Sequence, residues 1–259
     1  MAFIDCRFFS ETLRLSVSMY VVLPEAAQKT RTDREGRCPA LLLLHGLSDD
    51  HTIWMRRTSI ERYASEKGMA VVMPAAGRSY YQDMASGPKY WTFIAQEVPR
   101  VARAFFPLSP ARELNYVAGL SMGGYGALRV ALTYPQSYAA AASLSGALDL
   151  VLRRERAVQD GAFTPGEMEG IFGPAAHLGG TPSDLFHLAR QLAAAPGPKP
   201  RIYQYCGTND FLYDDNIRFR DLARGLDLDV TYAEDDGTHA WSFWDQQIRR
   251  VLEWITPKE

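Results

Sequence analysis

Residues 119–123 read Gly-Leu-Ser-Met-Gly, and this stretch constrains the fold of the chain more than any other. A short apolar run at 114–118 precedes it and favours a buried strand, while 124–132 has the composition of a helix that Pro135 stops. A serine on a tight turn from strand to helix holds strained backbone angles, so its neighbours must lack bulk. We therefore predict a nucleophile elbow with Ser121 at its tip.

Composition narrows the class of protein. A chain of 259 residues suits a single α/β domain, 1–259, and 47% hydrophobic residues indicate an ordinary globular protein. The net charge of −2 argues against a nucleic-acid or anionic membrane partner. No apolar run reaches the length of about 18 residues that a membrane-spanning helix needs.

The start of the chain and its cysteines bear on the compartment. Residues 1–7 lack the basic and apolar regions of a signal peptide. Cys6, Cys38 and Cys206 are odd in number and widely scattered, as is typical of reduced thiols. We therefore expect a cytoplasmic protein.

Runs that fit strands alternate along the chain with runs that fit helices. Residues 3–23 alternate apolar with polar side chains, which indicates a half-buried strand region. Buried strands are expected at 39–44, 69–73 and 114–118, and further strands at 138–144, 201–206 and 230–233. Helices are expected at 58–67, 94–105, 124–132, 217–226 and 241–255. This order predicts a doubly wound, mostly parallel sheet with antiparallel strands at its N-terminal edge.

One segment, 149–200, breaks the alternation. It holds about fifty residues rich in Gly and Pro between two core strands, and an ordinary crossover is much shorter. We interpret it as a lid-like insertion over the carboxyl ends of the strands. The alternative is a long crossover remote from the site.

A serine nucleophile needs a base, and the base needs a carboxylate that holds it in one tautomer. Asp210 follows the strand at 201–206, and His239 follows the strand at 230–233. Both residues therefore lie where the carboxyl ends of parallel strands meet, as Ser121 does. The order Ser, Asp, His is that of the α/β-hydrolases. We predict Ser121 as nucleophile, His239 as base and Asp210 as its orienting acid.

Other acids and histidines have simpler interpretations. Asp214 and Asp215 fit the start of a helix, where capping explains them, and Asp235 and Asp236 are turn formers. The remaining histidines lack metal-ligand spacing or lie outside the triad order: His45, His51, His177 and His187. We expect neither a metal nor a cofactor.

The tetrahedral oxyanion of acyl transfer needs two hydrogen-bond donors. The N–H of Met122, directly after the nucleophile, is one candidate. The second is the N–H of Leu47, in the loop after the strand at 39–44, where Gly46 lets the backbone turn. The alternative for this loop is an ordinary strand-ending turn.

Bulky aromatic residues crowd the loops near these positions and are candidates to line a substrate pocket beside Gly46. They serve the hydrophobic core in the alternative interpretation. The candidates are Trp54, Tyr80, Tyr81 and Trp91.

Taken together, these motifs resemble the tributyrin esterase branch of the esterase D / S-formylglutathione hydrolase superfamily. The resemblance covers almost the whole chain in the right order. It is carried by His45-Gly46-Leu47-Ser48 with Trp54, by 78–81, 97–99 and 119–127, and by 207–212 and 237–241.

This resemblance implies an α/β-hydrolase that cleaves short-chain acyl esters, without a cofactor, as a serine carboxylesterase. It implies the triad and oxyanion donors named above. The alternatives are an S-formylglutathione hydrolase-type thioesterase, an acetylxylan or feruloyl-type esterase, and an acyltransferase. A non-catalytic binding module on the same scaffold would need a missing triad member, and none is missing. The sequence leaves the oligomeric state open, a homo-oligomer included.

Overall fold

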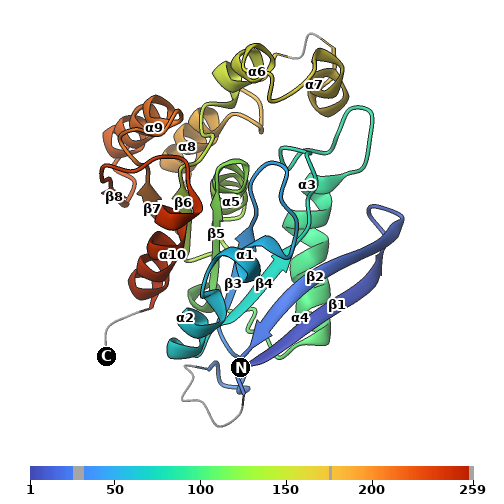
Figure 1. The fold of residues 1–259 in the computed structure, drawn as a ribbon. Helices are drawn as coiled ribbons and strands as arrows, with labels where there is room; N and C mark the ends of the chain where they lie inside the picture. The colour runs from blue at the N-terminus through green and yellow to red at the C-terminus, as the bar shows by residue number, and fades with distance from the viewer. Residues whose placement is uncertain (26–31, 175–176, 257–259) are drawn as a thin grey trace.

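A single eight-stranded sheet organises the chain, in the order β1-β2-β4-β3-β5-β6-β7-β8 (Figure 1). The computed structural model describes residues 1–25, 32–174 and 177–256. β2 pairs antiparallel with both β1 and β4, and the remaining neighbours are parallel, as the sequence predicted. The strands are β1 (Ala2–Ser10), β2 (Leu15–Leu23), β3 (Ala40–Leu44), β4 (Ala70–Pro74), β5 (Asn115–Leu120), β6 (Ala140–Leu144), β7 (Arg201–Tyr205) and β8 (Val230–Ala233).

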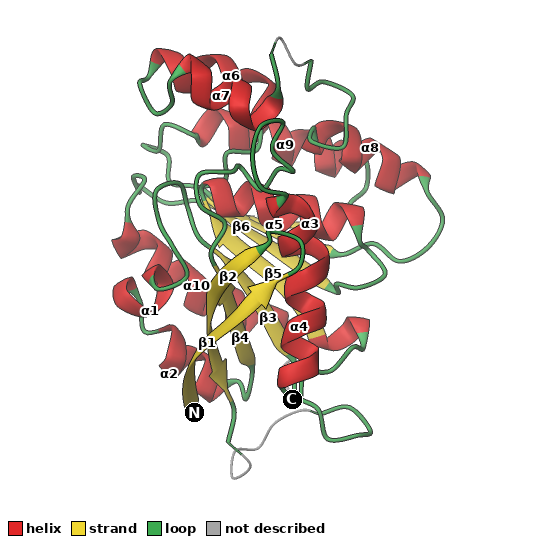
Figure 2. Ribbon diagram, turned by 90° about the vertical axis from the view of Figure 1, so that its right-hand side faces the viewer, coloured by secondary structure: helices red, strands yellow, loops and turns green. Residues whose placement is uncertain are grey.

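Helices cover both faces of this sheet. Figure 2 shows α2 and α10 on one side of the strands and α4 on the other. The helices are α1 (Ile53–Arg57), α2 (Ile60–Glu66), α3 (Tyr90–Thr92), α4 (Val98–Phe105), α5 (Met122–Thr133), α6 (Leu150–Gln159), α7 (Pro165–Phe172), α8 (Leu185–Ala194), α9 (Tyr213–Gly225) and α10 (Trp241–Ile255), with a π-helical turn η1 (Phe93–Glu97) and a 3₁₀ turn η2 (Arg112–Leu114). The expected doubly wound architecture is confirmed.

Alternation along the strands builds two apolar layers. In β3, Leu42 and Leu44 enter the layer that also holds α4 and α5, whereas Leu41 and Leu43 enter the layer that holds α2 and α10. All four side chains are buried, and burying a leucine contributes about 1.5–3 kcal/mol. The central strands are therefore apolar on both faces because both faces are covered.

Two details differ from the sequence expectation. The strand-like region 3–23 is a hairpin of two strands, turned at 11–14, where Arg14 adopts a left-handed φ of 57°. The expected helix at 94–105 begins as the π-helical turn η1, and Pro99 lies in the first turn of α4, where its missing N–H leaves no intrahelical bond unmade.

The segment 149–200 folds into α6, α7 and α8, with residues 175–176 outside the described residues. Polar side chains begin each helix: Asp149 caps α6, Thr164 forms a capping box with Glu167 at α7, and Asp184 caps α8. Figure 1 shows α6 and α7 at the top of the molecule, above α5. Across the described ranges, none of the helices combines the length and the apolar character that crossing a bilayer requires.

Candidate active site

Ser121 occupies the turn between β5 and α5 with φ 53° and ψ −120°. Such angles cost about 1–3 kcal/mol in a residue with a side chain and persist only where the surroundings hold them. The surroundings here leave no room for side chains on the flanking glycines. A Cβ on Gly123 would lie 2.5 Å from the carbonyl oxygen of Leu44, and one on Gly119 would lie 2.3 Å from that of Gly123. The close contact of β3, β5 and α5 thus imposes the strained turn.

The structure brings the three predicted triad residues together. His239 Nε2 lies 3.1 Å from Ser121 Oγ, and His239 Nδ1 lies 2.9 Å from Asp210 Oδ2. Asp210 stands in the loop between β7 and α9, and His239 stands between β8 and α10. A carboxylate only accepts hydrogen bonds, so Nδ1 carries the ring proton and Nε2 faces the serine hydroxyl as an acceptor. This is the arrangement a serine nucleophile needs.

Neighbouring side chains hold the triad in this geometry. The Asp210 carboxylate is buried and also accepts a 2.9 Å hydrogen bond from the Leu212 N–H. The His239 ring lies between aromatic rings, with centroid distances of 4.6 Å to Phe211 and 4.7 Å to Trp244. Trp244 is itself fixed by a hydrogen bond from its Nε1 to Ser145 Oγ. The imidazole therefore has little freedom to rotate away from Ser121.

The two predicted oxyanion donors come from backbone that adjoins Ser121. Met122 is the first residue of α5, so its N–H has no carbonyl partner within the helix. Leu47 lines the same cavity as Ser121. A Cβ built on Gly46 would lie 3.5 Å from Ser121 Cβ, so the loop that carries Leu47 passes directly beside the nucleophile.

His45 anchors this loop from inside the protein. Its Nε2 accepts a 2.8 Å hydrogen bond from the Ala76 N–H, and its Nδ1 lies 2.7 Å from the Gly46 carbonyl oxygen. Burial lowers the pKa of His45, so the ring is neutral with its proton on Nδ1. Tyr81 donates a hydrogen bond to the His45 carbonyl oxygen from the other side. His45 thus supports the loop, and within the described ranges no three His, Cys, Asp or Glu side chains are grouped to bind a metal.

Ser121 lines a cavity of about 420 Å³. The insertion 149–200 supplies one wall of it through Arg153, Asp160, Ala162 and Phe163. The other lining residues are Leu47, Tyr80, Ala147, Phe211 and Leu212. The cavity is therefore mostly apolar, with one arginine and one aspartate from the insertion.

The aromatic residues proposed to line the substrate pocket fall into two groups, one at the cavity and one used in packing. Tyr80 lines this cavity, as proposed from the sequence. Trp54 does not, and its assignment to the pocket is corrected: its side chain is 1% exposed, donates a hydrogen bond to the Leu44 carbonyl oxygen and packs edge-on against Trp241. It belongs to the core layer beneath α10.

The assignments of Tyr81 and Trp91 to the pocket are also corrected. Tyr81 is fully buried, and its hydroxyl is used by the His45 carbonyl oxygen. Trp91 stacks on Tyr134, and the Arg129 guanidinium lies 4.0 Å from its ring centroid. Both rings therefore serve packing, Tyr81 fully buried and Trp91 half-buried.

Sequence reasoning missed a buried ion-pair network beside the cavity. Asp215 is not a simple helix cap: it is fully buried, and it accepts hydrogen bonds from Arg153 Nε at 2.8 Å and from Arg218 Nη2 at 2.9 Å. Arg218 also reaches Asp149 at 3.2 Å, so the network joins α6 to α9. No sequence spacing indicates this pairing, since the partners lie 62 residues apart.

Sequence reasoning also missed Phe163 and Phe211 as lining residues. Phe211 directly follows Asp210, and that adjacency was the available signal. Phe163 lies in the insertion, where the sequence resembles the family least.

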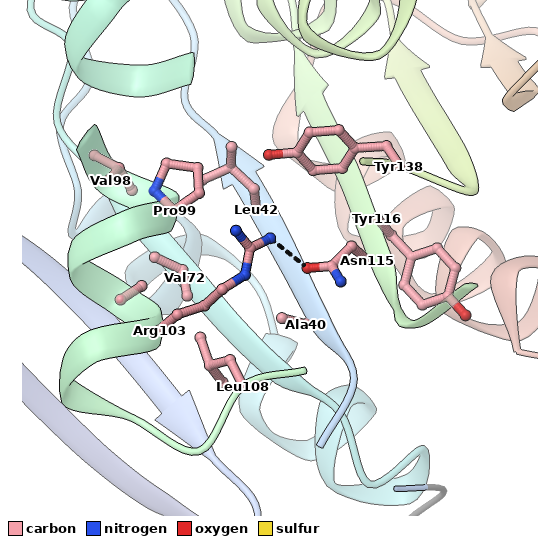
Figure 3. A pocket seen from close by; sticks show the side chains of 11 residues that line it. Ala40, Leu42, Val72, Val98, Pro99, Arg103, Leu108, Asn115, Tyr116 and Tyr138 are labelled. Atoms are coloured by element: carbon pink, nitrogen blue, oxygen red, sulfur yellow. Dashed lines mark hydrogen bonds between the residues drawn. The ribbon is translucent and has the colours of Figure 1, made fainter. Parts of the chain in front are cut away.

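A second, much smaller cavity lies at the opposite end of the strands (Figure 3). Its volume is about 30 Å³, which admits water but no substrate. Ala40 and Asn115, the first residues of β3 and β5, line it, and Arg103 donates a hydrogen bond to Asn115 Oδ1. Ser121 follows the last residue of β5, so this cavity is separate from the triad.

A doubly wound sheet that carries Ser, Asp and His at its strand ends defines an α/β-hydrolase of the serine hydrolase class. The model of the Esterase family, described as "Putative esterase", matches residues 10–255, and the chain belongs to that family. It is an enzyme, a carboxylic ester hydrolase, and the resemblance to the esterase D superfamily is confirmed.

Three relatives illustrate the match. The chain is 29% identical to an acetyl esterase of Caldicellulosiruptor saccharolyticus over 99% of this chain and 98% of the relative. It is 35% identical to the fluorophosphonate-binding serine hydrolase F of Staphylococcus aureus, solved with substrate bound, with a TM-score of 0.89 over 99% of both chains. It is also 35% identical to the S-formylglutathione hydrolase FrmB of the same organism, with a TM-score of 0.86 over 98% of both chains.

Proposed function

We propose that this esterase hydrolyses short-chain acyl esters through an acyl-enzyme on Ser121. The observation that carries this proposal is the hydrogen-bonded chain from Ser121 Oγ through His239 to Asp210, which opens into a mostly apolar cavity. A hydroxyl becomes an effective nucleophile only where a positioned base takes its proton.

In the acylation half, His239 Nε2 accepts the Ser121 proton as Oγ attacks the ester carbonyl carbon. The carbonyl π electrons move to oxygen, and the N–H groups of Leu47 and Met122 donate to the oxyanion. Asp210 stabilises the resulting imidazolium. The tetrahedral intermediate then collapses, the carbon–oxygen bond to the alcohol breaks, and His239 returns the proton to the leaving oxygen.

Deacylation repeats the sequence with water. His239 takes a proton from the water as its oxygen attacks the acyl carbon, and the same two amides hold the oxyanion. Collapse releases the acid and returns the proton to Ser121 Oγ. Each oxyanion donor contributes about 2.7–4 kcal/mol to such a reaction.

The shape of the cavity supports a short acyl group. Tyr80, Phe163 and Phe211 are bulky rings on its walls, and the insertion lines one side of it. An open groove would reward each added methylene by about 0.8 kcal/mol, whereas a bounded cavity penalises chains that exceed it. The similarity to an acetyl esterase supports the same conclusion.

The experiment is a kcat/KM panel of p-nitrophenyl esters from C2 to C12. We expect an optimum at C2 to C4 and a decline beyond it, and an optimum at C8 or longer would contradict the short-acyl proposal. In parallel, Ser121→Ala should lower kcat by about 10⁴-fold or more, and a fluorophosphonate should label Ser121 alone. Unchanged activity in that variant would end the proposal.

A thioesterase of the S-formylglutathione type is the second candidate, and the similarity to FrmB favours it. Glutathione carries two carboxylates, which would need positive charge at the cavity mouth. Two arginines near the mouth already have acidic partners: Arg78 with Glu167 at 3.1 Å and Arg153 with Asp215 at 2.8 Å. This pairing favours the neutral ester.

S-formylglutathione assayed beside a butyrate ester decides between the two candidates. Arg156 is an exposed arginine in the last turn of α6. Under the thioesterase alternative, Arg78→Gln and Arg156→Gln would each reduce thioester turnover far more than ester turnover. Equal losses on both substrates would count against it. A glycerol or sugar acceptor added to the same assay would reveal acyl transfer as a new ester product.

We propose the cytoplasm as the compartment of this enzyme. Cys6, Cys38 and Cys206 are all free thiols, and that state suits a reducing environment.

A further inference from the structure

The outer edge of β1 is an unpaired strand edge. β1 ends the strand order, so no strand of the described chain pairs with its outer side (Figure 1). The strand is nine residues long, whereas strands usually have about 5–6. A long free edge exposes a row of backbone N–H and C=O groups that can pair with another strand.

The side chains of β1 alternate between the two faces of the sheet. Ile4, Cys6 and Phe8 are half-buried against the core beneath α4. The residues between them are exposed, and they read Phe3, Asp5, Arg7, Phe9. Asp5 and Arg7 form a 3.0 Å ion pair at the centre of this row.

Exposed apolar side chains gather around this strand. Phe3 is 47% exposed and Phe9 is 62% exposed. Leu15, paired with Ser10 across the hairpin, and Phe105, whose ring contacts Phe8, are also exposed. The other large exposed apolar residues in the described chain belong to α6 and the catalytic cavity: Val151, Leu152 and Phe211. Apart from the catalytic region, β1 is therefore the place where apolar surface remains uncovered.

The order of residues along β1 is self-complementary about Cys6. If a second β1 lies antiparallel with Cys6 opposite Cys6, then Asp5 faces Arg7 and Phe3 faces Phe9 across the pair. On the other face of the sheet, Ile4 faces Phe8. Each of these three cross-strand pairs is either oppositely charged or apolar, and each of the three occurs twice by symmetry.

We propose that β1 is a homodimer interface, in which two copies of this chain pair their edge strands antiparallel about Cys6. The two sheets then join into one continuous sheet. The free backbone groups of both edges become hydrogen-bonded, and the exposed phenylalanines cover one another. A second copy fits this edge because its own β1 carries the matching charges in the matching order.

The charges also select one register. A slip that keeps the two faces aligned moves the pairing by two residues. It then places Asp5 opposite Asp5, or Arg7 opposite Arg7. Like charges directly opposite one another destabilise a strand pair. Only the register centred on Cys6 pairs both charges favourably.

Charge reversal tests the interface in solution. The oligomeric state of the full chain is measured by sedimentation velocity over a concentration series. We expect a dimer for the unaltered protein, and Asp5→Arg or Arg7→Asp alone should raise its dissociation constant by about tenfold or more, since each places like charges opposite one another twice. Arg190→Asp, an exposed reversal on α8, is the matched control and should leave the dimer unchanged.

Two complementation experiments distinguish strand pairing from a general loss of stability. The double variant Asp5→Arg/Arg7→Asp restores opposite charges and should restore the dimer. Mixing the Asp5→Arg protein with the Arg7→Asp protein should produce a heterodimer, although neither self-associates well. Esterase activity should persist in every variant, because β1 contributes nothing to the catalytic cavity, and this activity serves as the check on folding.

Cys6 provides an independent readout. Facing residues in antiparallel strands have Cα atoms about 4.5–5.5 Å apart, within the range that a disulfide spans. Mild copper–phenanthroline oxidation should therefore form a covalent dimer, which Cys6→Ser should abolish. A protein that stays monomeric at all concentrations, or single charge-reversal variants that dimerise as tightly as the unaltered chain, would overturn the proposal.

Discussion

Arg153 on α6 and Asp215 on α9 form a buried ion pair at the wall of the catalytic cavity, with Arg153 Nε 2.8 Å from Asp215 Oδ2. The pair fastens the insertion to the helix that follows the catalytic acid. Arg218 binds the other carboxylate oxygen of Asp215, with its Nη2 2.9 Å from Oδ1. The insertion is thus bound to the core by charge as well as by apolar contact.

Asp215→Asn should therefore destabilise the protein by about 3 kcal/mol, because it leaves the buried Arg153 charge with the more distant Asp160 carboxylate, at 3.9 Å, in place of Asp215. Urea unfolding at pH 7.5 measures the effect. Asp214→Asn is the matched control, since Asp214 is the exposed neighbour in the same helical turn, and it should change stability by less than about 0.5 kcal/mol. Equal effects at both positions would show that the ion pair contributes nothing.

Asp210→Asn should lower kcat by about 10⁴-fold with little change in stability. The amide can present its N–H to His239 Nδ1, and the ring then carries its proton on the wrong nitrogen. Steady-state kinetics with a butyrate ester measure the loss. Asp214→Asn should retain nearly full activity, and a comparable loss there would mean that the acid has been misassigned.

Gly123→Ala should prevent the elbow from forming, because its Cβ would lie 2.5 Å from the backbone oxygen of Leu44. We expect a loss of activity together with a stability loss of several kcal/mol, of order 3 or more. Gly225→Ala is the control: it stands in α9 with nothing within 4 Å, and it should stabilise the helix by about 0.5–1 kcal/mol. Thermal unfolding and activity together measure both variants.

Asp49 should make stability depend on pH. Burial, and then the charge of Asp50, raise its pKa to about 6 in the folded protein from 3.8. Between these values the folded state binds more protons than the unfolded state, so stability falls as pH rises through about 4 to 6. The loss should be about 1–2 kcal/mol, below the full value of the shift because Asp49 is partly in solvent.

Asp49→Asn should remove this dependence and be the more stable protein at pH 8. Asp50→Asn should behave differently. Desolvation raises the pKa of Asp50, but hydrogen bonds from Thr52 outweigh it and the net pKa is lowered. Its ionised form therefore stabilises the fold, and its loss should cost stability at pH 8. Urea unfolding at pH 4.5 and 8 compares the variants, and identical slopes in all three proteins would contradict the prediction.

Phe163→Ala should shift the acyl optimum toward longer chains. Phe163 is a buried ring from the insertion that packs on Tyr80 inside the cavity. If its removal makes room for about two of the four further methylenes of octanoate, each worth about 0.8 kcal/mol, the octanoate-to-butyrate ratio of kcat/KM should rise about tenfold. Phe172→Ala also removes a ring next to Tyr80, yet Phe172 does not line the cavity, and the ratio should stay unchanged.

The sequence by itself determined that the three catalytic residues follow strands and come in the order Ser, Asp, His. Ser121, Asp210 and His239 each follow a short run with the composition of a strand, and parallel strands end at one edge of a sheet. Local constraints also sufficed at the elbow, because a strained turn accepts only glycine where backbone passes at 2.5 Å. Periodicity and turn chemistry are local properties, so they can be read from neighbouring residues.

The tertiary structure alone decided what surrounds the triad. Trp54 and Tyr80 are both large aromatic residues that come soon after central strands, yet one packs beneath α10 and the other lines the cavity. Arg153 and Asp215 find each other across 62 residues. Which face a ring buries, and which charges meet, depends on how α6 and α9 pack in space. Packing of this kind is a long-range property that neither spacing nor composition contains.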